Sequence, residues 1–87
     1  MSLLIDVITE FSNELNEIIN TAKKLQYSLT YVVKMLDKMK QCKLSDEERV
    51  NFAICVTEIS SYVLKLNDLI NSLQTMLQNV REKLRKG

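Results

Sequence analysis

Apolar residues recur at alternating steps of four and three along almost the whole chain. The first series runs for five heptads without a polar residue: Leu4, Ile8, Phe11, Leu15, Ile18, Ala22, Leu25, Leu29, Val32, Leu36 and Met39. A second, equally regular series comprises Phe52, Val56, Ile59, Val63, Leu66, Ile70, Leu73, Leu77, Val80 and Leu84. This spacing puts each series on one stripe of an α-helix and is typical of helices that pack as coiled coils.

The two series are out of phase, so one continuous helix cannot keep both on a single stripe. Between them lies the segment Leu44-Ser45-Asp46-Glu47-Glu48. Ser45 and Glu48 have the spacing of a capping box, in which each side chain binds the backbone N–H of the other residue. We therefore predict a helix over about residues 2–41, a turn over about 42–45 and a second helix over about 46–86, in a single domain spanning 1–87.

A turn this short forces two long helices to lie side by side and antiparallel. The two stripes then pair about Leu44, so that Ile8, for example, faces Val80. Charge supports this alignment, because the first helix is acidic before Asn20 and basic after it, while the second begins acidic and ends basic. The sequence therefore predicts an all-α fold with two long helices in an antiparallel coiled-coil hairpin.

Both helices carry more apolar surface than one stripe uses. The additional apolar residues lie beside the stripes: Ile5, Val7, Ile19, Val33 and Met35 in the first helix, and Cys55, Tyr62, Leu69 and Met76 in the second. Faces this broad are typical of helices that pack against more than one neighbour. We predict that these nine residues form a protein interface, most simply between two hairpins in a two-fold symmetric four-helix bundle. A parallel dimer of the second helix is an alternative.

Few residues that carry chemistry are present. The chain has no histidine, no Gly-rich phosphate loop and no zinc-ligand spacing of its cysteines, so the commonest acid, base and ligand motifs are missing. We interpret Glu10, Glu14 and Glu17, which share a helix face, as a solvated acidic surface. We expect no enzyme activity, no cofactor and no metal.

Cysteine usage and hydropathy favour an intracellular location. Cys42 and Cys55 lie too far apart along the predicted hairpin for the ~7 Å Cα limit of a disulfide, and two free thiols fit a reducing environment. No apolar run approaches the ~20 residues of a membrane-spanning helix. We expect a cytoplasmic or otherwise intracellular protein.

The second half of the first helix is basic, and one stripe on its outer face combines lysines with tyrosines: Lys24, Tyr27, Tyr31, Lys34 and Lys38. Such a stripe can contact an anionic partner or a nucleic acid. Our leading hypothesis is a non-catalytic interaction or assembly subunit that binds itself as a homodimer or binds another helical protein. Nucleic-acid binding by this basic half is the alternative. Reversible membrane attachment through the apolar residues of segment 3–7 is a third hypothesis.

Overall fold

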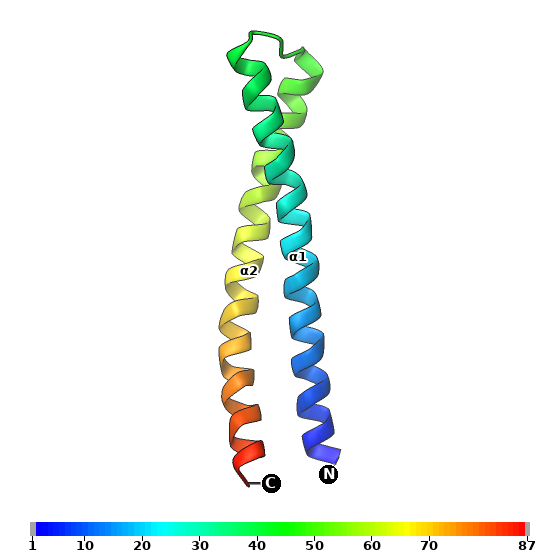
Figure 1. Cartoon of the computed structure of the whole chain (residues 1–87), viewed down its shortest axis with the longest axis vertical. Coiled ribbons are helices and arrows are strands. Elements are labelled where there is room, and N and C mark those ends of the chain that lie inside the picture. Colours follow the sequence, from blue (N-terminus) through cyan, green and yellow to red (C-terminus); the bar gives the residue numbers. More distant parts are fainter. Residues whose placement is uncertain (1, 87) are drawn as a thin grey trace.

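The computed structural model describes residues 2–86 and is an antiparallel hairpin of two α-helices (Figure 1). Helix α1 spans Ser2–Lys40 and helix α2 spans Asp46–Lys86. The helices wind around each other to give a rod of 62 × 16 × 15 Å, with the turn at one end and both chain ends at the other. The predicted all-α hairpin is confirmed.

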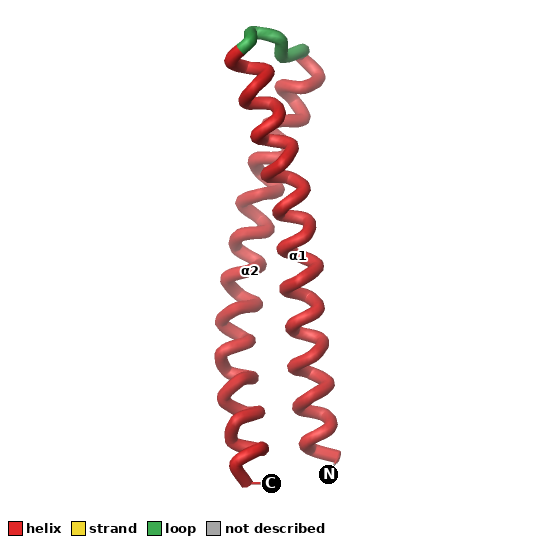
Figure 2. Tube along the Cα trace, in the orientation of Figure 1, coloured by secondary structure: helices red, strands yellow, loops and turns green. Residues whose placement is uncertain are grey.

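Helix α1 ends in a Schellman motif, which leads into the short loop of Figure 2. The N–H of Lys43 donates to the carbonyl of Lys38 at 2.9 Å, and the N–H of Cys42 donates to the carbonyl of Met39 at 3.0 Å. These bonds satisfy carbonyls that a helix end leaves open. Cys42 takes the left-handed conformation that the motif requires, with φ at 56°. Glycine is the usual residue there, because a Cβ costs roughly 1–2 kcal/mol in this conformation.

Helix α2 begins with the predicted capping box. The N–H of Glu48 donates to Ser45 Oγ at 3.2 Å, and the N–H of Ser45 donates to Glu48 Oε1 at 3.1 Å. Glu48 Oε2 also accepts a hydrogen bond from Lys38 Nζ, in an ion pair that joins the last turn of α1 to the first turn of α2. The Lys38 hydrogen bond, followed by the Ser45 backbone bond, lowers the pKa of Glu48 from 4.5 to about 2.

The contact between α1 and α2, which we call the seam, uses only half of the predicted stripes. One predicted column of each helix lies half-buried in it: Leu4, Phe11, Ile18, Leu25 and Val32 in α1, and Phe52, Ile59, Leu66, Leu73 and Val80 in α2. The prediction is wrong for the other column. Its place is taken by Val7, Glu14, Thr21, Ser28 and Met35 in α1, and by Cys55, Tyr62, Leu69 and Met76 in α2. Each helix is therefore rotated about its own axis relative to the prediction.

Small side chains line the α1 side of the rotated seam. Thr21 and Ser28 are buried between the helices, and they share the seam with the larger Tyr62 and Leu69 of α2. The thiol of Cys55 donates to the carbonyl oxygen of Ser28 at 3.9 Å. Small residues in one helix let the helices approach and leave room for larger side chains of the other, as close packing requires. The resulting core is thin, because Met35 and Leu69 are the only apolar side chains of the described residues that are buried.

Candidate interaction surface

Ten apolar residues that the sequence places in the seam lie outside it. We call them the apolar face: Ile8, Leu15, Ala22, Leu29 and Leu36 of α1, with Val56, Val63, Ile70, Leu77 and Leu84 of α2. The larger side chains among them keep between 37% and 62% of their surface exposed. Every position of the two columns from Ile8 to Leu36 and from Val56 to Leu84 is apolar, so the exposed surface is continuous over this length rather than a scatter of single residues.

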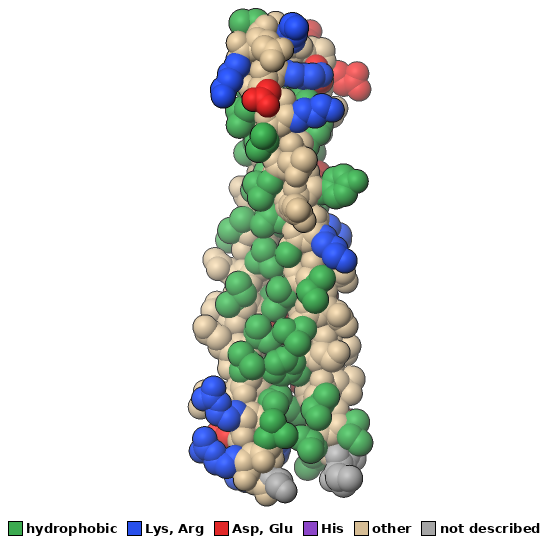
Figure 3. Space-filling view, viewed as in Figure 1, with side chains coloured by type: hydrophobic (Ala, Val, Ile, Leu, Met, Phe, Trp, Pro, Cys, Tyr) green, Lys and Arg blue, Asp and Glu red, His purple; other side chains and the backbone are tan. Residues whose placement is uncertain are grey.

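The two columns of the apolar face lie on the same side of the hairpin. Each follows a seam residue by four positions, as Ile8 follows Leu4 and Val56 follows Phe52. In an antiparallel pair of right-handed helices, equivalent positions beside the seam point to the same side. Figure 3 looks onto this side and shows hydrophobic side chains in a band along the line where the helices meet. Near the chain ends the band is hollowed into a groove of about 260 Å³, lined by Ile8, Phe11, Ser12, Leu15 and Val80.

Three of the residues predicted to contact a partner lie at the edge of this face. Ile5, Ile19 and Val33 are exposed, and each lies three residues before a member of the apolar face on α1. Residues three apart are neighbours on a helix surface. The three side chains therefore widen the apolar surface on the α1 side.

The other six residues predicted to contact a partner lie in the seam. Met35 is 2% exposed and Leu69 is 8% exposed, so both belong to the core between the helices and not to the surface where they were predicted. Val7, Cys55, Tyr62 and Met76 are half-buried in the same contact. The sequence placed the wrong second column in the seam, because on α1 the column that is exposed is entirely apolar whereas the seam column includes Glu14, Thr21 and Ser28.

The opposite side of the hairpin has a different composition, and we call it the polar face. Its residues each lie one position before a heptad position of the seam, starting from Phe11 on α1 and Phe52 on α2: Glu10, Glu17, Lys24, Tyr31 and Lys38 of α1, with Asn51, Glu58, Lys65, Ser72 and Asn79 of α2. Leu3, which precedes Leu4 at the end of the same α1 column, is an exposed apolar residue. Tyr31 is the one aromatic member, and the remainder are charged or polar. This face carries three acidic and three basic side chains (Glu10, Glu17 and Glu58; Lys24, Lys38 and Lys65), so it has no net charge of one sign.

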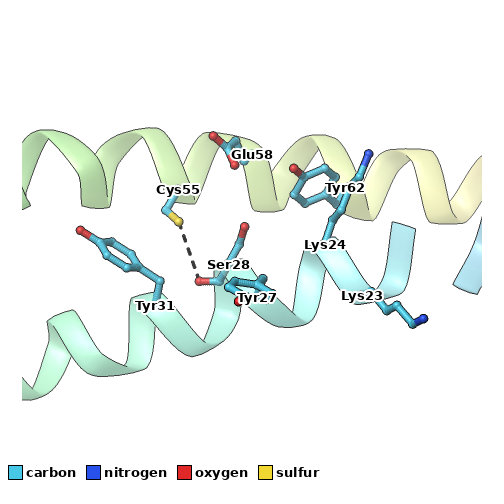
Figure 4. Close-up of a pocket in the computed structure, with 8 residues that line it drawn as sticks. All are labelled: Lys23, Lys24, Tyr27, Ser28, Tyr31, Cys55, Glu58 and Tyr62. Carbon is cyan, nitrogen blue, oxygen red and sulfur yellow. Dashed lines mark hydrogen bonds between the residues drawn. The ribbon is translucent and has the colours of Figure 1, made fainter. Parts of the chain in front are cut away.

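A shallow groove of about 420 Å³ lies on the polar face (Figure 4). Helix α1 contributes Lys23, Lys24, Tyr27, Ser28 and Tyr31, and α2 contributes Cys55, Glu58 and Tyr62. The tyrosines line it beside both cationic and anionic groups. Since Glu58 lines the same groove as Lys23 and Lys24, the groove suits a partner of mixed polarity better than a polyanion.

The predicted basic stripe is only partly free to contact a partner. Tyr27 is 85% exposed, and Lys24 and Lys34 are also exposed. Tyr31 is half-buried against α2, and the ammonium group of Lys38 is held by Glu48. The stripe therefore offers two unengaged lysines and one free aromatic ring, fewer than its five residues indicate.

Within residues 2–86, no three His, Cys, Asp or Glu side chains gather closely enough to hold a metal ion. Of the three glutamates on the acidic half of α1, Glu14 is half-buried in the seam, while Glu10 and Glu17 are exposed. Both cysteines are free, Cys42 at the exposed turn and Cys55 in the seam. Over the same residues, neither helix has the length and hydropathy to cross a membrane.

No protein-family model matches the chain, and no curated protein or solved structure matches it either.

Proposed function

We propose that this chain is a non-catalytic assembly module that works by packing its apolar face against other helices. The observation that carries the proposal is the continuous apolar face on a hairpin whose own core is thin. A surface of this kind on a soluble chain marks an interaction site. Helical partners suit it best, because its apolar residues follow the heptad spacing by which helices interdigitate.

The size of the apolar face sets the strength of the association. Burying a Leu, Ile or Val side chain completely contributes ~1.5–3 kcal/mol. The residues of the face have roughly half their surface still exposed, so together they stand to gain on the order of 10 kcal/mol, an upper estimate. Bringing two molecules together costs an estimated ~4–15 kcal/mol. Gain and cost are comparable, so the association should respond to protein concentration and to single substitutions.

Light scattering over a concentration series tests the proposal. The wild-type chain should form particles heavier than the 10.1 kDa monomer. Leu29→Glu and Val63→Glu each place a charge within the apolar face, and each should weaken association by roughly tenfold or more, equivalent to about 1.4 kcal/mol. Matched controls are Tyr27→Glu and Ser61→Glu, which introduce the same group two residues away at exposed sites outside the face. The controls should associate like the wild type.

One result would contradict this function. The wild-type chain could remain at 10.1 kDa at every concentration, melt cooperatively, and keep the same melting temperature in Leu29→Glu and Val63→Glu. The apolar face would then be stable in water and would need no partner.

Nucleic-acid binding through the basic half of α1 has less support. Exposed Lys24, Tyr27 and Lys34 favour it, but Glu48 holds Lys38 and Glu58 lines the groove beside Lys24. Binding of this kind weakens steeply as salt concentration rises. A salt titration of single-stranded and duplex nucleic acid with wild type, Lys24→Glu and Lys34→Glu would separate the functions, since both substitutions lie outside the apolar face.

A further inference from the structure

The residues bordering the apolar face have an internal symmetry. Between residues 5 and 33 of α1 the border column consists of Ile5, Ser12, Ile19, Gln26 and Val33, and between residues 53 and 81 of α2 it consists of Ala53, Ser60, Asn67, Gln74 and Arg81, all exposed. Lys40 and Asp46 continue the two columns at the turn, outside this symmetric stretch. On α1, apolar residues occupy the middle and both ends, and polar residues occupy the two places between. On α2 the middle and its neighbours are polar. If either border column is read in the opposite direction about its central residue, apolar residues coincide with apolar ones and polar residues with polar ones. The one exception is the pair Ala53 and Arg81.

The two centres of symmetry lie at the same level of the hairpin. Lys38 and Glu48 are paired across the seam, and Ile19 and Asn67 each lie nineteen residues further from the turn than that pair. Both helices rise by ~1.5 Å per residue, so they reach this level together. A single axis perpendicular to the rod can therefore serve as the symmetry axis of both helices.

Two two-fold arrangements bring the apolar faces of two copies together. With both turns at the same end, α1 of one copy lies against α2 of the other, which sets Ile19 beside Asn67 and Ile5 beside Arg81. With the turns at opposite ends, α1 lies against α1 and α2 against α2. Ile19 then meets Ile19 of the second copy, and Ile5 meets its Val33. Burying apolar groups beside an amide or a guanidinium leaves polar groups without partners, which is costly.

Size also suits a second copy. The charges of α1 do not choose between the two arrangements, because Glu10, Glu17, Lys24 and Lys38 lie on the polar face, away from the contact. A face 62 Å long and 16 Å wide offers on the order of 1,000 Å², enough for the ~800 Å² per partner of a stable interface.

We propose that the partner is a second copy of this chain, packed apolar face to apolar face with the two turns at opposite ends of a four-helix bundle. The two-fold axis passes through the level of Ile19 and Asn67. This inference rests on the proposed function, and it adds the identity of the partner and the direction in which it lies.

Cys42 is a natural probe of this arrangement, because it is exposed at the turn. In a Cys55→Ala background, a spin label or dye on Cys42 marks the end of each copy. The label-to-label distance in the dimer should be close to the 62 Å length of the hairpin. A bundle with both turns at one end would instead hold the labels within about twice the 16 Å width. A control label on Asn20→Cys, with both native cysteines replaced, lies near the axis and should give a short distance in either dimer.

The outcomes separate this inference from the function on which it rests. A dimer with a long Cys42 distance and a short Asn20→Cys distance is the expected result. A dimer with a short Cys42 distance overturns the opposite-end arrangement and leaves the assembly function intact. A trimer or larger particle overturns the two-copy bundle alone. The chain could instead stay monomeric and sediment with phosphatidylcholine–phosphatidylserine vesicles, with Leu29→Glu abolishing this sedimentation. The apolar face would then bind a lipid surface, and both the inference and the proposed function would be overturned.

Discussion

The two sides of the hairpin border the same seam but have opposite compositions. All ten positions of the apolar face are apolar, whereas nine of the ten positions of the polar face are charged or polar. The hairpin as a whole is thus amphipathic in the way that a single surface helix usually is. This difference gives the rod an apolar and a polar side, and the proposed association uses the apolar side only.

A second contrast lies between the apolar face and the seam itself. The seam column of α1 contains Glu14, Thr21 and Ser28, while the adjacent exposed column contains Leu15, Ala22 and Leu29. An isolated hairpin would gain more from the reverse arrangement, because apolar burial is the main stabilising contribution to folding. The observed arrangement, with polar side chains in the seam and apolar ones outside it, becomes favourable when a contact between molecules buries the exposed column as well.

The largest expected effect tests the separation of seam and face at two adjacent residues. Met35 is 2% exposed in the seam and Leu36 is 44% exposed on the apolar face. Met35→Ala should destabilise the hairpin by about 2–5 kcal/mol, because it leaves a cavity in the core. Leu36→Ala should act mainly through association, so its effect on the melting temperature should shrink as the protein is diluted. If both variants lowered the melting temperature equally and at every protein concentration, the distinction between seam and apolar face would be contradicted.

A smaller effect is expected at the turn, which holds both faces in place. Cys42→Gly removes the Cβ from a residue with φ at 56° and should stabilise the hairpin by about 1 kcal/mol in chemical denaturation. The gain should be the same in wild type and in the Leu29→Glu background, since the turn lies outside the apolar face. Lys34→Gly, at an exposed position inside α1, is the matched control and should destabilise by roughly 0.5–1 kcal/mol. A loss of stability in Cys42→Gly would show that the side chain matters more than its strain.

The smallest effect concerns the polar side of the turn and depends on pH. The pKa of Glu48 is lowered from 4.5 to about 2 by Lys38 and Ser45, so the folded state favours the ionised carboxylate. Its contribution to stability is complete above about pH 5 and is lost as the pH falls from about 4.5 toward 2. Denaturation across this window should show a shallower fall for Glu48→Gln than for wild type. Glu47→Gln removes a charge from the same turn but leaves the bonds of Glu48 to Lys38 and Ser45 intact. If its stability changed with pH in the same way as that of Glu48→Gln, the pH dependence could not be assigned to Glu48.

Local signals were strong enough to predict most of the fold. Ser45 and Glu48 predicted the capping box because their spacing alone sets that geometry, and the heptad spacing predicted both long helices. The Schellman motif was missed, since Cys42 stands where glycine is the usual sequence signal. The candidate site was predicted in part: Ile5, Ile19 and Val33 border the exposed face, while Met35 and Leu69 lie in the core.

The sequence by itself determined two antiparallel helices, the place of the turn, and an excess of apolar surface over what one helix pair can bury. It could not determine which apolar column of each helix faces the other. On α1 the column that includes Val7 and Met35 and the column that includes Ile8 and Leu36 lie on either side of Leu4, and heptad spacing is the same for both. In the structure the seam takes the column with small side chains, in which Thr21 and Ser28 are buried and the thiol of Cys55 donates to the Ser28 carbonyl. Only the tertiary structure could decide it, because the fit depends on the shapes of residues distant in the chain.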